Sequence, residues 1–169
     1  MKIEKIETPR LYLRGFTPAD AGFALSIWND PEMGEYLLDE AIETVSDAYR
    51  REIEQLGEDE ECCYLIAEDK ESGTRIGTCS FIPADGVYDL AYCVHKQFWR
   101  QGYATEMVGG MIAHARSQGA KKITIVISNE NAASNAVAKK FGCRVAETLT
   151  EKKRGSDRVF TDYKYELDL

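Results

Sequence analysis

The chain has 169 residues, 44% of them hydrophobic and 30% charged, which suits one globular domain spanning residues 1–169 with a single sizeable core. Its net charge of −8 argues against general nucleic-acid binding, because an acidic surface repels phosphate backbones, and weakly favours a cationic partner such as an amine. The sequence has neither a long uncharged apolar run, which argues against a membrane span, nor the features of a signal peptide.

The N-terminal part predicts a strand followed by two helices. Residues 11–16 alternate between apolar and polar types, which is typical of a strand. A helix is expected over residues 17–29, because Thr17 is a capping residue and Pro18 suits the first helical turn. A second helix is expected to begin at residue 44 or 46 and to end at residue 56.

Three strands are expected next, over residues 62–68, 75–82 and 87–95. The breaks between them, at residues 70–73 and 83–86, are short and rich in turn residues. Short breaks of this kind predict an antiparallel meander.

The C-terminal part predicts two more helices and three more strands. Apolar residues recur at helical spacing over residues 102–118, and a nearly continuous apolar run at 121–127 is typical of a buried central strand. A short helix over 131–141 and two strands, around 143–150 and 158–167, complete the chain. The sequence therefore predicts an α+β (mixed α/β) domain with one twisted, mostly antiparallel sheet of about seven strands and about four helices.

The cysteine pattern indicates reduced thiols rather than disulfides or zinc. The cysteines are Cys62, Cys63, Cys79, Cys93 and Cys143. Their number is odd and no C-x-x-C pair occurs, so we expect no metal site and a cytoplasmic protein.

The segment from Trp99 to Glu106 lies between a predicted strand and a long helix. A helix start offers unpaired N–H groups and a partial positive charge, which suit a phosphate or pyrophosphate. Gly102 allows close approach of the backbone to a ligand, and Arg100 adds a positive charge. The spacing matches neither the Walker loop nor G-x-G-x-x-G, and on this segment alone a plain helix start is an equal alternative.

A second polar segment follows the 121–127 strand. Asn131 precedes the short helix, where its side chain can reach the amides of an extended ligand if the strand diverges from its neighbour. Ser134 lies one turn further on and offers a hydroxyl. Taken in isolation, this segment is better explained by an ordinary N-cap.

Three patterns in register change this balance. Residues 8–14 match T-x-R-L-x-L-R, residues 99–106 match W-x-x-G-Y-A-T-E, and residues 131–142 match N-x-x-S-x-x-V-x-x-K-x-G. Over nearly its whole length the chain thereby resembles the GCN5-related N-acetyltransferase (GNAT) superfamily, and within it the ribosomal-protein-alanine acetyltransferase branch. Trp99 and Cys143 depart from residues frequent in the superfamily, and Asp89 stands where this branch often has Glu.

The resemblance implies the GNAT fold, with acetyl-coenzyme A in a cleft between two splayed central strands. Backbone N–H groups of residues 101–105 would hold the pyrophosphate, and backbone groups near Cys93 and Val94 would align the pantetheine arm and polarise the thioester. Ser134 would hydrogen-bond the departing thiolate. The expected donor-binding residues are Cys93, Val94, Arg100, Gln101, Gly102, Tyr103, Ala104, Thr105, Asn131 and Ser134.

The implied activity is transfer of an acetyl group from acetyl-CoA to a primary amine, with a protein N-terminal α-amino group as the leading acceptor. Asp89 is the candidate base, Glu32 and Glu35 are expected on the acceptor side, and water alone is an alternative base. A small-molecule amine (an antibiotic, a polyamine or an amino acid) is an alternative acceptor. A non-catalytic acyl-CoA-binding module is a further alternative, against which the presence of Asn131 and Ser134 weighs. A homodimer is also expected, since members of this branch often pair.

Overall fold

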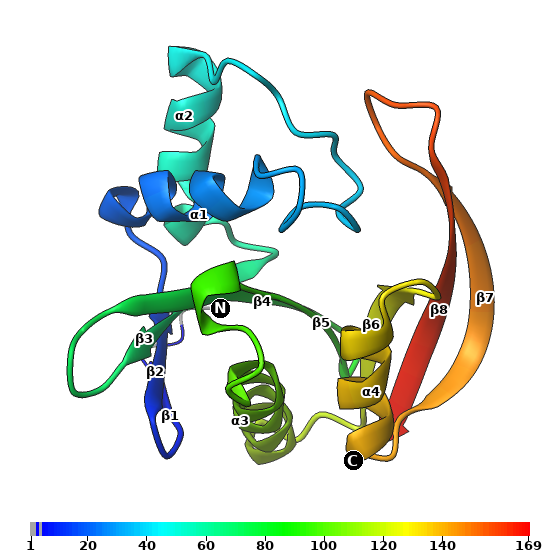
Figure 1. Ribbon diagram of the computed structural model, residues 1–169. Coiled ribbons are helices and arrows are strands. Elements are labelled where there is room, and N and C mark those ends of the chain that lie inside the picture. The colour runs from blue at the N-terminus through cyan, green and yellow to red at the C-terminus, as the bar shows by residue number, and fades with distance from the viewer. Residues whose placement is uncertain (1–2, 4) are drawn as a thin grey trace.

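Figure 1 shows the computed structural model of the chain, which describes residues 3 and 5–169. Over these residues one sheet of eight strands has the order β1-β2-β3-β4-β5-β6-β8-β7, and only the β5–β6 pair is parallel. The strands are β1 (Lys5–Glu7), β2 (Leu11–Gly15), β3 (Cys63–Asp69), β4 (Arg75–Ala84), β5 (Val87–Val94), β6 (Lys122–Ser128), β7 (Arg144–Lys152) and β8 (Val159–Asp168). The predicted mixed, mostly antiparallel fold is confirmed.

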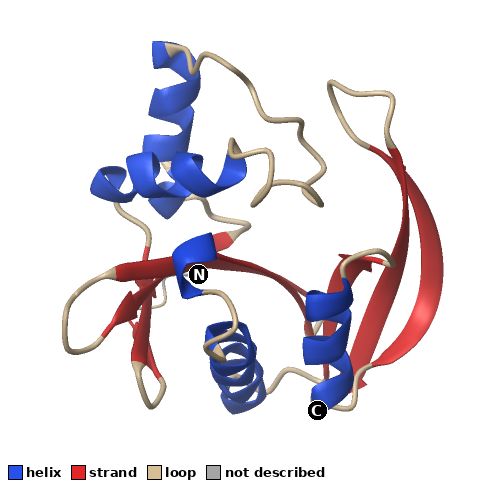
Figure 2. Cartoon of the chain, viewed as in Figure 1, coloured by secondary structure: helices blue, strands red, loops and turns tan. Residues whose placement is uncertain are grey.

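Helices cover the two faces of the sheet unequally (Figures 1 and 2). The α-helices are α1 (Ala21–Trp28), α2 (Asp47–Glu54), α3 (Tyr103–Ser117) and α4 (Ala132–Lys140). Short 3-10 turns are η1 (Pro18–Asp20), η2 (Leu56–Glu58) and η3 (Lys96–Phe98). The helices α3 and α4 lie on one face, and α1 and α2 lie on the other.

Two features near the N-terminus differ from the sequence prediction. The short edge strand β1 was not predicted; its Ile6 is buried while Lys5 and Glu7 are exposed, and it pairs with β2. The expected helix over 17–29 divides into η1 and α1, because the Asp20 carboxylate folds back to accept hydrogen bonds from the N–H and hydroxyl of Thr17.

The turn between β4 and β5 is tighter than predicted. Pro83 and Ala84 belong to β4, and the turn consists of Asp85 and Gly86 alone. Both have positive φ angles, 50° and 81°, as a two-residue hairpin turn that follows the twist of its strands requires.

The main core lies between the sheet and α3, where apolar side chains of alternate strand residues meet the helix. It includes Leu90 of β5, Ile125 of β6, Tyr165 of β8 and Met107 of α3. A smaller cluster packs α1 and α2 against β3, and the indole N–H of Trp28 reaches Thr78 on β4.

The helices α1 and α2 leave part of their face of the sheet uncovered (Figure 1). Because side chains alternate along a strand, the residues between the core positions of β5, β6 and β8 point to this side. We call this area the open face; it carries Asp89, Ala91, Thr124, Val126 and Asp162.

Strands β5 and β6 pair over only part of their length. Their register runs from Val87↔Lys122 to Leu90↔Ile125 and then stops. Beyond that point β5 stays paired with β4 as far as Val94, and β6 stays paired with β8 as far as Ser128. Each strand follows its outer neighbour, so the two diverge and leave a gap in the middle of the sheet.

Candidate active site

The loop before α3 presents a concentrated set of free backbone donors. Arg100 and Gly102 both have left-handed backbones, with φ angles of 61° and 79°, and Gly102 is the N-cap of the 15-residue helix α3. Within the described part of the chain, the N–H groups of residues 100–105 have no hydrogen-bond acceptor. Free N–H groups at a helix start, arranged by left-handed residues, are typical of a phosphate site.

This loop is held in place by the first motif of the chain. The carboxylate of Glu106 accepts hydrogen bonds from the Thr8 hydroxyl (2.7 Å), the Arg10 backbone N–H (2.6 Å) and Arg10 Nε (2.6 Å). Arg10 Nη1 also donates to the Gln101 carbonyl at 2.9 Å, and its guanidinium lies 4.1 Å from the centre of the Tyr103 ring. The Glu106 side chain therefore has a structural role, because it joins the loop to the β1–β2 hairpin.

The gap between β5 and β6 exposes backbone groups of β5. The His95 N–H donates to Ile76 of the β4 side, and in an antiparallel ladder every second residue faces the same neighbour. The backbone groups of Cys93 therefore pair with Thr78, whereas those of Tyr92 and Val94 point into the gap. The Val94 carbonyl accepts a hydrogen bond from the Trp99 indole at 2.8 Å. Of the two residues expected to align the donor, Val94 directs its backbone groups into the gap and Cys93 directs its own towards β4.

The cysteines are not arranged for nucleophilic catalysis. All five are free thiols, and burial raises the pKa of each. For Cys93, beside the gap, burial raises the pKa to about 11. The nucleophilic thiolate is therefore scarce at neutral pH.

The start of α4 is anchored to the ends of β6 and β8. Asn131 Oδ1 accepts the Ser134 N–H at 3.2 Å, so Asn131 is the N-cap, and its Nδ2 has no hydrogen-bond acceptor among residues 3 and 5–169. Asn135 Nδ2 donates to the Ser128 carbonyl at 2.9 Å, and Asn135 Oδ1 accepts the Tyr165 hydroxyl at 2.7 Å. The Ser134 hydroxyl is held on this rigid turn.

Tyr92 is a candidate that sequence reasoning missed. Its hydroxyl is buried, and no described group lies in hydrogen-bonding geometry with it. Burial raises the Tyr92 pKa, while the Ser134 side chain lies near enough to oppose that rise. A tyrosine in an apolar strand looks like an ordinary core residue, and only the placement of α4 brings it to Ser134.

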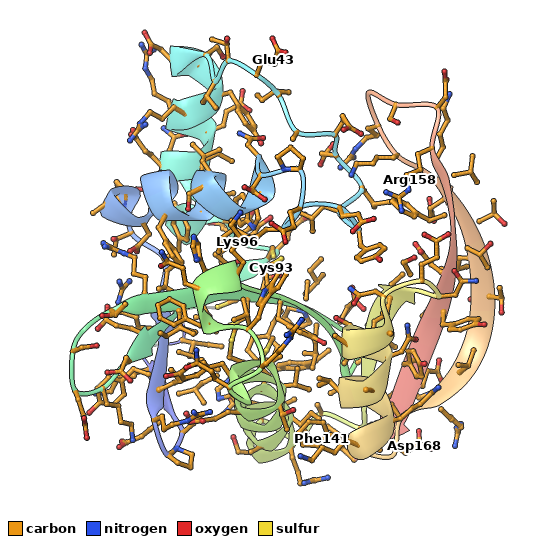
Figure 3. All side chains as sticks on the ribbon, in the orientation of Figure 1. Glu43, Cys93, Lys96, Phe141, Arg158 and Asp168 are labelled. Atoms are coloured by element: carbon orange, nitrogen blue, oxygen red, sulfur yellow. The ribbon has the colours of Figure 1, made fainter. Side chains whose placement is uncertain are left out.

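The predicted acceptor-side carboxylates lie on a loop that crosses the open face. This loop, residues 30–40, is called the strap. Glu32 pairs with Lys96 at 3.1 Å, and Glu35 pairs with Arg158 at 3.5 Å, both cations being labelled in Figure 3. The two glutamates therefore contribute to fastening the strap, Glu32 next to the end of β5 and Glu35 next to the β7–β8 hairpin.

A buried lysine fastens the strap further. Lys153 is 4% exposed, and its Nζ donates to the carbonyls of Gly34 (3.1 Å) and Glu35 (2.9 Å). The Tyr36 hydroxyl reaches the Glu130 carbonyl ahead of α4 at 3.4 Å. The basic stretch at 152–154 thus includes a residue that positions the strap.

Asp89 lies on the open face but away from the mouth of the gap. Its Oδ1 accepts the Thr124 hydroxyl at 2.5 Å, and the two residues are partners in the paired part of β5 and β6. Cys93 lies four residues further along the strand, roughly 13 Å away at ~3.3 Å per residue. The structure therefore separates Asp89 from the end of β5.

Residues 3 and 5–169 contain no cluster of three or more His, Cys, Asp or Glu side chains arranged to hold a metal ion. Among the same residues, no helix combines the length and apolar character that crossing a bilayer requires.

The chain is similar to known proteins in both sequence and structure. The family model described as the acetyltransferase (GNAT) domain matches residues 10–144. The uncharacterized N-acetyltransferase p20 of Bacillus licheniformis is 25% identical, over 98% of this chain and 96% of that protein. The spermidine N-acetyltransferase of Vibrio cholerae, solved with CoA and spermine, aligns with a TM-score of 0.81 at 16% identity, over 94% of this chain and 95% of that chain.

RimL, the ribosomal L7/L12 alpha-N-protein acetyltransferase, aligns with a TM-score of 0.80 at 18% identity, over 98% of this chain and 94% of that chain. At these identities the solved structures support the fold. The family match includes the loop at 99–106 and the start of α4, and it spans most of the sequence. The resemblance drawn from three motifs is confirmed, and the chain belongs to the GNAT acetyltransferase family and is an enzyme of acetyl transfer.

Proposed function

We propose that this enzyme transfers an acetyl group from acetyl-CoA to a protein N-terminal α-amino group. One observation carries the proposal: the free N–H groups of residues 100–105 lie beside a gap in the sheet that opens towards an uncovered face. A diphosphate held at the loop would let an extended thiol arm pass through the gap. The acetyl group would then meet an amine arriving on the open face.

The residues present fit the donor. The amides of residues 101–105 suit the pyrophosphate, with Gly102 leaving room for close approach and the exposed Arg100 supplying positive charge. The backbone N–H of Val94 and the side-chain Nδ2 of Asn131 offer one donor each to the pantetheine arm from opposite sides of the gap. The family relative solved with CoA supports this donor.

The transfer requires a neutral amine, which attacks the thioester carbonyl carbon. A C–N bond forms, the C–S bond breaks, and the departing thiolate needs a hydrogen-bond donor. In this proposal the Ser134 hydroxyl supplies that donor, and the Tyr92 hydroxyl lies next to the Ser134 side chain. A backbone N–H aimed at the developing oxyanion contributes about 3 kcal/mol to the transition state.

The open face favours a peptide over a polyamine as acceptor. Ile82 and Val126 leave 47% and 43% of their area exposed there, which suits an apolar side chain next to a single amine. A polyamine carries several positive charges and gains little binding energy from such an apolar surface. The protein acetyltransferase RimL, which shares the fold, supports the same acceptor class.

A thiol-release assay tests the proposal. Purified enzyme and acetyl-CoA are mixed with short peptides beginning with Ala, Ser or Met, with spermidine, and with an aminoglycoside. We expect release with the peptides, and calorimetry should detect acetyl-CoA binding. Absence of acetyl-CoA association at millimolar concentration would refute the donor, and release with spermidine or the aminoglycoside alone would refute the acceptor class.

The role of Ser134 has its own test. We expect Ser134→Ala to lower kcat more than it raises the KM for acetyl-CoA, because the hydroxyl would act on the leaving thiolate rather than on the bound donor. Ser117→Ala, at the far end of α3 with its hydroxyl on the His114 carbonyl, is the matched control. An unchanged kcat in Ser134→Ala would remove this residue from the mechanism.

We extend the proposal to location and assembly. The five free cysteines suit a reducing compartment such as the cytoplasm. A homodimer, as expected from the resemblance, would have about twice the 19.0 kDa mass of the chain in light scattering. A monomer at assay concentrations would contradict it.

A further inference from the structure

Asp162 lies on the open face beside the end of β6, and β6 separates it from the gap. It pairs in register with Ser128, the last residue of β6, and with Leu149 of β7. Its neighbours Tyr163 and Tyr165 belong to the core on the α3 and α4 side, so Asp162 points the other way. Phe160, two residues earlier on the same side, lies under Tyr36 of the strap, with ring centres 6.4 Å apart. Asp162 is therefore placed between the diverging end of β6 and the strap.

The Asp162 carboxylate is buried and has no partner. Asp20 and Asp162 are the two buried carboxylates in the described part of the chain, at 0% and 6% exposure. Asp20 accepts hydrogen bonds from Arg14, Arg75 and Thr17, whereas no hydrogen bond or ion pair from residues 3 and 5–169 reaches Asp162. Its carboxylate oxygens are not completely covered by protein, so they keep some contact with solvent. An uncompensated buried carboxylate is costly, so the site is ready for a cation.

The surroundings of Asp162 increase this readiness. Burial raises the Asp162 pKa, and the negative charge of Glu151 on β7 raises it further. Lys164 and Glu166 follow on the same side of β8, and Arg158 before β8 is occupied by Glu35 and Glu130. Neither Lys164 nor Arg158 contributes to the shift of the Asp162 pKa. A carboxylate whose pKa lies nearer neutrality is a better-matched proton acceptor for an amine.

The other acidic candidates are already occupied. Asp89 is hydrogen-bonded to Thr124, Glu32 and Glu35 are paired with cations, and Glu166 accepts Lys122 Nζ at 2.8 Å. Asp162 combines burial, a free carboxylate and a position beside the end of β6.

We propose that Asp162 binds the ammonium group of the acceptor and removes its proton, and so acts as the general base of the reaction. This inference rests on the proposed function. One N–H proton passes from the ammonium group to the Asp162 carboxylate, and the nitrogen lone pair then forms the C–N bond to the acetyl carbon. The C–S electrons leave with the thiolate, and the acylated nitrogen releases its second proton to give the neutral amide. The thiolate gains one proton to become the free thiol, and Asp162 returns the other proton to solvent.

The test compares Asp162→Asn with Asp89→Asn and wild type. Initial rates are measured with an alanine-first peptide from pH 6 to pH 10, and acetyl-CoA binding is measured by calorimetry. We expect Asp162→Asn to bind acetyl-CoA within twofold of wild type and to lose roughly 100-fold in kcat/KM for the peptide at pH 7. The loss should shrink above pH ~8, where the α-amino group is neutral without help. Asp89→Asn should stay within threefold of wild type.

A second measurement does not depend on turnover. Binding of the same peptide with a free or an acetylated N-terminus is compared in the absence of acetyl-CoA. Wild type should prefer the free amine at least tenfold, and Asp162→Asn should lose that preference while its urea midpoint stays equal or rises. Equal binding of the two peptides by wild type, or kcat/KM of Asp162→Asn within threefold of wild type, overturns the inference. Failure of acetyl-CoA binding in wild type would instead refute the proposed donor, and the peptide comparison would still decide the role of Asp162.

Discussion

The link between Arg10 and Glu106 makes a quantitative prediction about the phosphate loop. In Glu106→Gln, the remaining carbonyl oxygen can keep the bonds from Thr8 and from the Arg10 backbone, which both reach Oε1. The new NH2 group, however, faces Arg10 Nε, so one charge-assisted bond becomes a contact between two donors. The Glu106 side chain is only 12% exposed, so water replaces this bond poorly. We expect a loss of about 2 kcal/mol in the free energy of unfolding.

The same substitution should weaken acetyl-CoA binding. Arg10 would lose the partner that aims its guanidinium at the Gln101 carbonyl and at Tyr103. The loop amides would then be less well ordered before the ligand arrives, and we expect the Kd for acetyl-CoA to rise roughly tenfold, or about 1.4 kcal/mol. Calorimetry measures the Kd, and urea unfolding measures stability, with an expected midpoint shift of ~1 M at unchanged m.

A matched control and a pH series sharpen this test. Glu54→Gln removes an exposed pair with Arg50 on α2 and should cost at most about 0.5 kcal/mol. Burial works against ionisation of Glu106, but the bonds from Thr8 and Arg10 outweigh it and hold the pKa below its ordinary value of 4.5. A lowered folded-state pKa gives stability that is present above pH 4.5 and lost as the pH falls through the lowered pKa. The difference in the free energy of unfolding between wild type and Glu106→Gln should therefore become smaller as the pH falls below 4.5. A Glu106→Gln variant no different from Glu54→Gln in both assays would refute the reasoning.

Three further substitutions test separate parts of the structure. Burial opposes ionisation of Asp20, yet hydrogen bonds from Arg14, Arg75 and Thr17 hold its pKa well below 3.8. We expect Asp20→Asn to lower the free energy of unfolding in urea by about 3 kcal/mol at pH 7, and by progressively less below pH 3.8. The control Asp39→Asn removes an exposed ion pair and should cost at most about 1 kcal/mol. Equal losses in the two variants would contradict this account. Gly102→Ala and Gly119→Ala place alanine at φ angles of 79° and 76° without a steric clash, so each should cost about 1 kcal/mol, but only Gly102→Ala should weaken acetyl-CoA binding in calorimetry. Tyr92→Phe removes a buried hydroxyl that lacks a partner, so it should leave the urea midpoint equal or higher while kcat falls; an unchanged kcat would exclude the hydroxyl from the reaction.

Local patterns in the sequence predicted the elements and the family. The α3 helix, the strong β6 strand and the Asn131 cap all follow from spacing or from residue type over a few positions. The family follows from three short motifs, each contiguous in the chain. The predicted bounds of an element differ from the structure where tertiary contacts compete with local preference. Asp20 is an example, because its carboxylate accepts hydrogen bonds from Arg14 and Arg75 as well as from Thr17 in the turn.

The arrangement of the candidate site was decided by tertiary structure. Arg10 and Glu106 are 96 positions apart, and nothing local to either residue indicates the other. The same holds for Tyr92 beside Ser134 and for the ion pairs by which Glu32 and Glu35 of the strap reach Lys96 and Arg158. Asp162 looks like one more strand carboxylate in the sequence, and only the registers of β6, β8 and β7 place it, buried and unpaired, beside the end of β6. The physical reason is that strand pairing and helix packing set which distant side chains meet, whereas the sequence alone determines what each side chain can do.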